Sequence, residues 1–92
     1  MKHKTLGTNG ITSATITEQT ERFIVTNLLL LKNDDLTNDL YINFNAPTTS
    51  ANCICLKPGE SLEDLDLPIS SVYYKSSAST VSFRLIGVNY NE

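Results

Sequence analysis

The feature that most constrains this chain is a short segment in which apolar and polar residues alternate. Residues Leu40–Asn45, with the sequence LYINFN, place apolar side chains at positions 40, 42 and 44 and polar-tipped ones between them. Side chains at i and i+2 lie on the same face of a β-strand. The period therefore predicts a strand with one apolar face and one polar face.

Similar short segments recur along the chain, separated by turn signals about every 8–12 residues. The most apolar segment, Arg22–Leu31, is expected to be buried on both faces for part of its length or to carry a bulge near Asn27. The turn at Lys57–Glu60 fits a type II turn, and Gly87 is expected to mark a bulge. Further strands are predicted over residues 11–17, 52–56, 69–74 and 81–86. The expected fold class is all-β, a single small antiparallel β-sandwich or barrel of about six to eight short strands.

Composition supports strands and excludes several classes of protein. The 92 residues include 9 Ser, 11 Thr and 9 Asn, whose short polar side chains suit exposed strand faces and turns better than helix interiors. We expect one domain over residues 11–92, preceded by an extended arm over residues 1–10. A net charge of −3 provides no basic surface for nucleic acid, and the apolar run Leu28–Leu31 is too short to span a membrane. We therefore expect no nucleic acid and no membrane among its partners, and synthesis in a cytosol.

The two cysteines, Cys53 and Cys55, are expected to be reduced, small core residues on either side of an outward-facing Ile54, or the inverse arrangement. On a strand they would lie on one face with parallel Cβ directions, which does not suit a disulfide. A structural metal site needs about four ligands, and the only histidine, His3, falls in the expected arm. A nucleophilic cysteine or serine would need a base partner, and no internal histidine is present. We expect a protein that is not an enzyme and that holds no cofactor or metal.

The acidic residues fall into two groups that could serve either of two purposes. A calcium site would need six to eight converging oxygen ligands. The first group, in the order Asp-Asp-Leu-Thr-Asn-Asp over residues 34–39, lacks the glycine and the alternating ligands of an EF-hand loop. The simpler interpretation is a pair of solvated loops that keep the protein soluble. The two groups are Asp34, Asp35 and Asp39, then Glu60, Glu63, Asp64 and Asp66.

Four side chains are candidates for a contact surface: Tyr41, Tyr73, Tyr74 and Arg84. Tyrosine is enriched at protein interfaces because its ring is apolar and its hydroxyl can hydrogen-bond. Tyr73 and Tyr74 are adjacent, so on a strand one is expected in the core and the other on the surface. Arg84 shares one face of its strand with Ser82 and could pair with an acidic loop of a neighbouring molecule. A platform that binds sugar is an alternative use of the exposed tyrosines.

Five segments taken together resemble a known group of proteins: Arg22–Asn27, Leu40–Asn45, Ile54–Leu62, Ser71–Tyr74 and Val81–Arg84. In order, they are similar to the strand and turn markers of small β-rich accessory proteins of tailed-bacteriophage virions. That group includes head decoration proteins, modules of head fibres and minor structural proteins. The resemblance covers about residues 20–87, and none of its motifs is a catalytic signature.

The resemblance implies a non-enzymatic structural protein of the virion, made in the cytoplasm of a bacterial host. The partners it implies are the major capsid protein or other virion proteins, and further copies of the chain in a closed homo-oligomer, with a trimer favoured. Exposed edge strands and the arm over residues 1–10 are the expected contact elements. The alternatives are a β-sandwich module that binds carbohydrate or a receptor, and a small intracellular regulator of a host protein.

Overall fold

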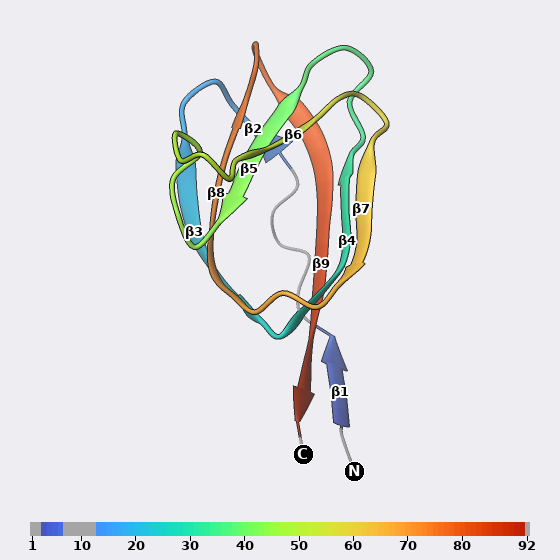
Figure 1. Cartoon of the computed structure of the whole chain (residues 1–92). Helices are drawn as coiled ribbons and strands as arrows, with labels where there is room; N and C mark the ends of the chain where they lie inside the picture. Colours follow the sequence, from blue (N-terminus) through green and yellow to red (C-terminus); the bar gives the residue numbers. More distant parts are fainter. Residues whose placement is uncertain (1–2, 7–12, 92) are drawn as a thin grey trace.

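The structure is a computed structural model that describes residues 3–6 and 13–91, with strands and no helix among them. The strands pack as two antiparallel sheets (Figure 1), which confirms the predicted all-β fold and identifies it as a β-sandwich. The strands are β1 (His3–Leu6), β2 (Ser13–Ala14), β3 (Gln19–Val25), β4 (Asn27–Asn33), β5 (Leu40–Phe44), β6 (Ile54–Leu56), β7 (Ser61–Leu65), β8 (Ile69–Ser76) and β9 (Val81–Asn91).

The two sheets draw their strands from alternating parts of the chain. The five-stranded sheet has the order β1-β9-β4-β7, and β2 also pairs with the first residues of β9. The four-stranded sheet has the order β3-β8-β5-β6. The long strand β9 pairs with β4 along the sandwich, and its last residues, Val88–Asn91, pair with β1 (Figure 1).

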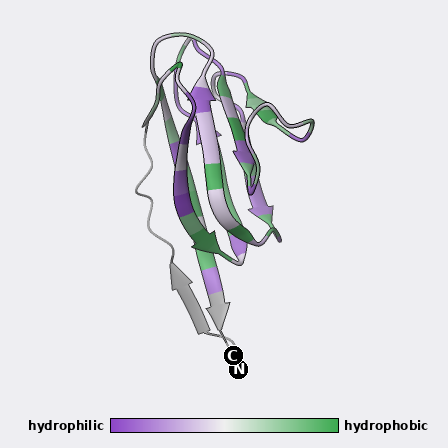
Figure 2. Cartoon of the chain, turned by 90° about the vertical axis from the view of Figure 1, so that its left-hand side faces the viewer, coloured by the Kyte–Doolittle hydropathy of each residue, from purple (hydrophilic) through white to green (hydrophobic). Residues whose placement is uncertain are grey.

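A single apolar core fills the space between the sheets. The two layers meet through aromatic rings, with the centre of the Tyr74 ring 5.6 Å from that of Phe83. In the hydropathy view, green and purple segments follow one another along the strands, as expected when alternate side chains face the core (Figure 2). Fully buried members from the two sheets include Leu28, Leu31, Phe83 and Leu85 on one side and Leu40, Ile42 and Val72 on the other.

The segment predicted as one strand over residues 22–31 is two strands in different sheets. The chain bends at Thr26, so β3 ends in the four-stranded sheet and β4 begins in the five-stranded sheet. The backbone nitrogen of Thr26 donates to the carbonyl of Val88 at 3.0 Å, which holds the crossing against β9. The apolar density arises because both halves line the same core, β3 with Val25 and β4 with Leu28 and Leu31.

A bulge next to Gly87 occurs as predicted. Leu28 pairs with Gly87 and Leu30 with Ile86, so β4 has one residue more than β9 at this point. A Cβ atom added to Gly87 would lie 2.6 Å from a γ-carbon of Val25 in the opposite sheet. Glycine is required here because the two sheets approach each other too closely for any side chain.

Other expectations agree with the structure in part. The turn at Lys57–Glu60 has Gly59 at φ +83° and a 3.0 Å hydrogen bond from the nitrogen of Glu60 to the carbonyl of Lys57, as a type II turn requires. Strand β7 was not predicted, because its leucines lie at mixed spacing. The expected strand over residues 11–17 is confined to β2 among the described residues. Of the expected arm over residues 1–10, His3–Leu6 forms β1, and the rest lies outside the described residues.

Replacing Gly87 by alanine should destabilise the sandwich. The new methyl group would meet the side chain of Val25, and overpacking of this kind costs about 1–3 kcal/mol. Urea denaturation of the wild-type and Gly87→Ala proteins measures the loss. In a Val25→Ala background the same change should cost less, because the obstructing γ-carbons are absent. An equal cost in both backgrounds would show that the Val25 contact is not the cause.

Candidate contact surface

Two of the predicted contact residues, Tyr41 and Tyr73, lie on the outer face of the four-stranded sheet. Tyr41 on β5 is opposite Lys75 on β8, and Tyr73 on β8 is opposite Asn43 on β5. The two tyrosines are therefore diagonal neighbours on the central strands, at a spacing that aromatic side chains can bridge. Both are half-buried, so each ring rests on the sheet and keeps part of its surface free.

Two further side chains complete this surface. The Nζ atom of Lys75 lies 5.9 Å from the centre of the Tyr41 ring, within the range of a cation–π interaction. Cys55, on the edge strand β6, pairs with Tyr41 and is exposed. We call Tyr41, Tyr73, Lys75 and Cys55 the outer tyrosine face. Its backbone belongs to paired strands, so its side chains are held on a rigid support.

The expectation that both cysteines are core residues is wrong for Cys55. Both are free thiols, as expected, but only Cys53 is partly buried. Ile54, between them, packs against the core, so the strand turns Cys55 to the outside. Burial raises the pKa of the Cys53 thiol, so that it forms the reactive thiolate less readily. The sequence left the direction of this short strand open, because Cys-Ile-Cys can present either face.

Tyr74 is a core residue and is not part of any contact surface. Only 3% of it is exposed, and its ring packs against Phe83 of the other sheet. Burial, and then a hydrogen bond with Glu21, raise the pKa of its hydroxyl to about 12. The prediction that one of the two adjacent tyrosines is buried is thus confirmed, and Tyr73 is the surface member.

Arg84 pairs within its own chain, so it is not available to a neighbour in the way that the sequence suggested. Its Nε and Nη2 atoms donate to the two carboxylate oxygens of Asp34 at 2.7 and 3.0 Å. The Arg84 guanidinium lowers the pKa of the Asp34 carboxyl. This bidentate pair fixes the start of the loop over residues 34–39 against β9.

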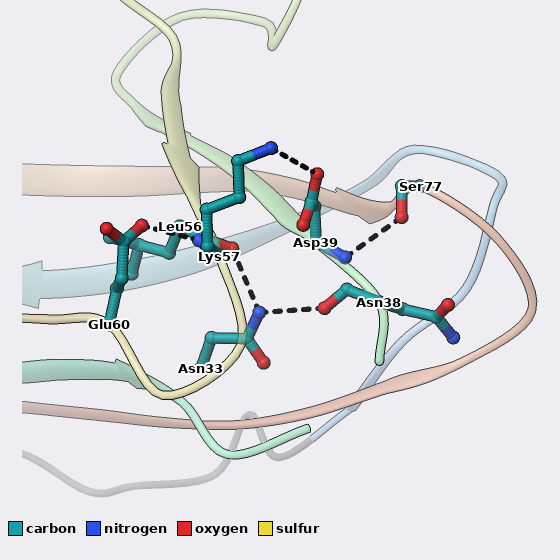
Figure 3. Close-up of polar contacts among 7 residues, drawn as sticks. All are labelled: Asn33, Asn38, Asp39, Leu56, Lys57, Glu60 and Ser77. Atoms are coloured by element: carbon teal, nitrogen blue, oxygen red, sulfur yellow. Dashed lines mark hydrogen bonds and ion pairs between the residues drawn. The ribbon is translucent and has the colours of Figure 1, made fainter. Parts of the chain in front are cut away.

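Next to that pair, a buried asparagine holds the loops over residues 34–39 and 57–60 together at one end of the sandwich. Asn33 is fully buried, and its Nδ2 atom donates to the carbonyls of Asn38 and Leu56, each at 2.9 Å. Its Oδ1 atom accepts from the nitrogen of Asp35 at 2.9 Å. Figure 3 shows the Asn33 amide between its two carbonyl partners, with the Lys57–Asp39 ion pair of 3.1 Å above it. We call the loops over residues 34–39, 57–60 and 77–80 the Asn33 loop end.

The loop over residues 34–39 is closed by its own side chains and still presents a leucine to solvent. The Oδ2 atom of Asp35 accepts from the nitrogens of Thr37 and Asn38 at 3.2 and 2.8 Å. The side-chain amide of Asn38 donates to the hydroxyl of Ser79 at 3.2 Å. Leu36, at the tip, is 92% exposed. Leu36 was not predicted as a contact residue, because it is a single leucine among turn residues and belongs to no periodic pattern.

The opposite end of the sandwich holds a small pocket. The chain after β5 turns at Asn45, with φ +65°, and the Oδ1 atom of Asn45 accepts from the nitrogen of Ser70 at 2.9 Å. The Glu18 carboxylate accepts from the nitrogen and the hydroxyl of Thr48, which fastens the following loop. The pocket has a volume of about 250 Å³ and is lined by Asn43, Phe44, Asn45, Ala46, Ser50, Asn52, Ile54 and Leu67.

Several of the acidic residues make contacts within the chain. Asp34 pairs with Arg84, Asp39 pairs with Lys57, and Asp66 accepts from the amide of Asn27 at 3.1 Å. Among the described residues, no three His, Cys, Asp or Glu side chains are grouped closely enough to hold a metal ion. The first group thus shapes the loop over residues 34–39, whereas Glu63 and Asp64 of the second group lie on the edge strand β7.

Three sheet edges are built in ways that discourage a partner strand. The edge strand β6 has only three residues, and β3 is irregular between Arg22 and Val25. The edge strand β7 carries Glu63 and Asp64, and the latter has a φ of +54°. Short, bulged and charged edges are the usual means of preventing strand addition. The expectation that edge strands make the contacts is therefore less favoured than contact through the outer tyrosine face.

No protein-family model, curated protein or solved structure matches the chain. The described residues form no helix long and apolar enough to cross a membrane. The functional proposal therefore depends on the surfaces of this chain and on the sequence resemblance.

Replacing Asn33 by alanine should destabilise the Asn33 loop end. Two carbonyls and one N–H group would lose their partner, and we expect the free energy of unfolding to fall by about 2–4 kcal/mol. Urea denaturation measures the change. In the matched variant Asn33→Asp the acceptor remains, but the two donated bonds are lost and a buried carboxylate faces two carbonyls. We therefore expect Asn33→Asp to be at least as unstable as Asn33→Ala at neutral pH. A stability between those of the wild type and Asn33→Ala would contradict this explanation.

The Asp34–Arg84 pair predicts a dependence of stability on acid pH. The pKa of Asp34 is lower in the folded chain than in the unfolded one, so the pair contributes stability above the ordinary pKa of about 3.9. That contribution is lost as the pH falls through the lowered value. Asp34→Asn should therefore cost up to about 1 kcal/mol at neutral pH, and the difference from wild type should vanish in acid. Thermal unfolding over a pH series tests this, with Arg84→Gln as the companion variant. A difference in stability between Asp34→Asn and the wild type that persists in acid would exclude the Asp34–Arg84 pair as the source of that difference.

Proposed function

We propose that the chain is a non-enzymatic structural protein of a tailed-phage virion, most consistent with a head accessory protein of the decoration type. It is made in the bacterial cytoplasm and binds the major capsid protein, or another virion protein, together with further copies of itself. The sequence resemblance supports this proposal, because its segments coincide with strands β3, β5, β6, β8 and β9 of the sandwich.

The observation that carries the proposal is the outer tyrosine face. Tyr41 and Tyr73 present partly free rings from the two central strands of one sheet, and Lys75 adds a charge beside Tyr41. Aromatic side chains on rigid backbone lose little conformational freedom when a partner covers them. Such a face suits adhesion to another protein surface.

The mechanism we propose is adhesive and depends on repetition. One small face gives a modest affinity, since only a few residues of an interface contribute most of the binding energy. A shell carries the same site many times, and copies that also contact each other bind with an affinity well above that of one contact. A trimer is the favoured closed assembly, as expected from the resemblance.

Loss of the two exposed rings should weaken attachment to the particle. We expect phage that carries Tyr41→Ala together with Tyr73→Ala to contain much less of the chain, because both rings leave the outer tyrosine face. Mass spectrometry of purified virions measures the amount, and Glu63→Ala, on the other sheet, is the matched control. Complete absence of the wild-type chain from virions would refute the proposed function, and unchanged retention of the double variant would exclude this face as the point of attachment.

A carbohydrate-binding module is the second candidate, because the same diagonal pair of tyrosines could support a sugar ring. A glycan array with the purified chain separates the two functions. Binding that disappears in Tyr73→Ala would favour the module, and a blank array leaves the structural role. Tyr74→Ala is unsuitable as a test variant, because Tyr74 lies in the core.

A further inference from the structure

In the loop over residues 34–39, an ordered backbone carries a large apolar side chain that faces the solvent. Leu36 is the most exposed of the large apolar side chains in the described residues, at 92%, compared with 63% for Ile16. The backbone on both sides of it is held by hydrogen bonds of Asn33 and Asp35. These hydrogen bonds order the backbone of the loop, so the Leu36 side chain projects into solvent from a defined point at the tip.

Fixed, protruding apolar side chains act as anchors in protein interfaces. Binding energy concentrates in a few side chains that enter pockets of the partner, and a pre-ordered loop avoids the entropy cost of immobilisation. The charges beside Leu36 are mostly compensated within the chain, since Asp34 pairs with Arg84 and Asp39 with Lys57. A partner surface can therefore approach the tip without meeting two free carboxylates.

The pocket at the other end of the sandwich has the chemistry to receive such a side chain. Phe44, Ala46, Ile54 and Leu67 supply its apolar lining, and none of the described residues that line it is charged. Its volume of about 250 Å³ exceeds the roughly 150 Å³ of an apolar cavity that holds a benzene molecule. The leucine side chain has fewer heavy atoms than benzene, so it fits.

The rim of the pocket suits the polar surroundings of Leu36. Exposed Asn52 and half-buried Ser50 carry amide and hydroxyl donors there. The carboxylate of Asp35, next to Leu36 in the chain, is an acceptor that such donors can bind. The amides of Asn43 and Asn45 are already engaged with Pro47 and Pro68, which keeps the pocket wall in shape.

One copy of the chain cannot fill its own pocket. The loop over residues 34–39 precedes β5, whereas the pocket begins where β5 ends at Phe44, about 13 Å further along the strand. Figure 1 shows that loop at the top and the connection between β7 and β8, which contributes Leu67, at the bottom. Leu36 and the pocket are therefore at opposite ends of the sandwich.

We propose that Leu36 of one copy inserts into the Phe44–Leu67 pocket of a second copy, so that the chain associates head to tail. This inference rests on the self-association contained in the proposed function and names the surfaces that make it. A contact between two different surfaces is heterologous, and it produces a ring where the rotation between copies closes and a filament where it does not. A trimer formed in this way is a ring of three equivalent contacts.

Two variants block the two halves of the contact separately. Leu36→Asp removes the anchor, and Asn52→Trp places an indole at the mouth of the pocket. Light scattering after size exclusion, over a range of concentrations, should show wild-type masses at multiples of 10.2 kDa and monomers for each variant alone. We expect each change to weaken association at least about 30-fold. Ile16→Asp, the same type of change at another exposed site, should leave the mass as in wild type.

Mixing the two variants provides the sharpest test. Leu36→Asp keeps an intact pocket and Asn52→Trp keeps an intact anchor, so the mixture should form a one-to-one dimer and nothing larger. Circular dichroism and thermal unfolding verify that every variant is folded. A wild-type chain that stays monomeric, a Leu36→Asp variant that keeps the wild-type mass, or a mixture that fails to dimerise would each overturn the inference. None of these results affects the presence of the chain in virions, which tests the proposed function separately.

Discussion

The side-chain amide of Asn33 joins the two sheets at one end of the sandwich, and the surrounding loops depend on it. Asn33 ends a strand of the five-stranded sheet, and its amide reaches the carbonyl of Leu56 in the four-stranded sheet. Its backbone nitrogen and carbonyl pair with Glu60 and Gly59 of the loop between β6 and β7. A buried amide with all of these partners gives one arrangement of the loops, because any other leaves polar groups unpaired in the core.

A small sandwich that is organised in this way presents surfaces more readily than deep clefts. Its one core uses the inward side chains of both sheets, so chemistry that faces a partner must come from outer faces and loop tips. Among the described residues, the outer tyrosine face and the tip at Leu36 are two places where partly or fully exposed apolar groups stand on rigid backbone. Both features agree with a protein that works through repeated contacts.

The candidate contact residues show how far sequence reasoning reaches. Alternation placed Tyr41 on the polar face of its strand, and the structure agrees, because that strand borders a single core. For Tyr73 and Tyr74, alternation indicated opposite faces without saying which one is inside. Arg84 was correctly placed on an outer face, but its partner, Asp34, is fixed by the return of β4 alongside β9. Leu36 was missed because hydropathy patterns record periodic residues, and an isolated leucine in a turn has no period.

The sequence by itself determined that the chain forms short β-strands with turns such as Lys57–Glu60, since period, β-branched residues and turn residues act over a few neighbours. Only the tertiary structure decided that residues 22–31 divide between two sheets, that Gly87 must lack a side chain opposite Val25, and that the tip at Leu36 and the pocket lie at opposite ends. These features depend on contacts between segments distant in the chain. Such contacts are set by how two sheets pack around one core, and no local pattern encodes them.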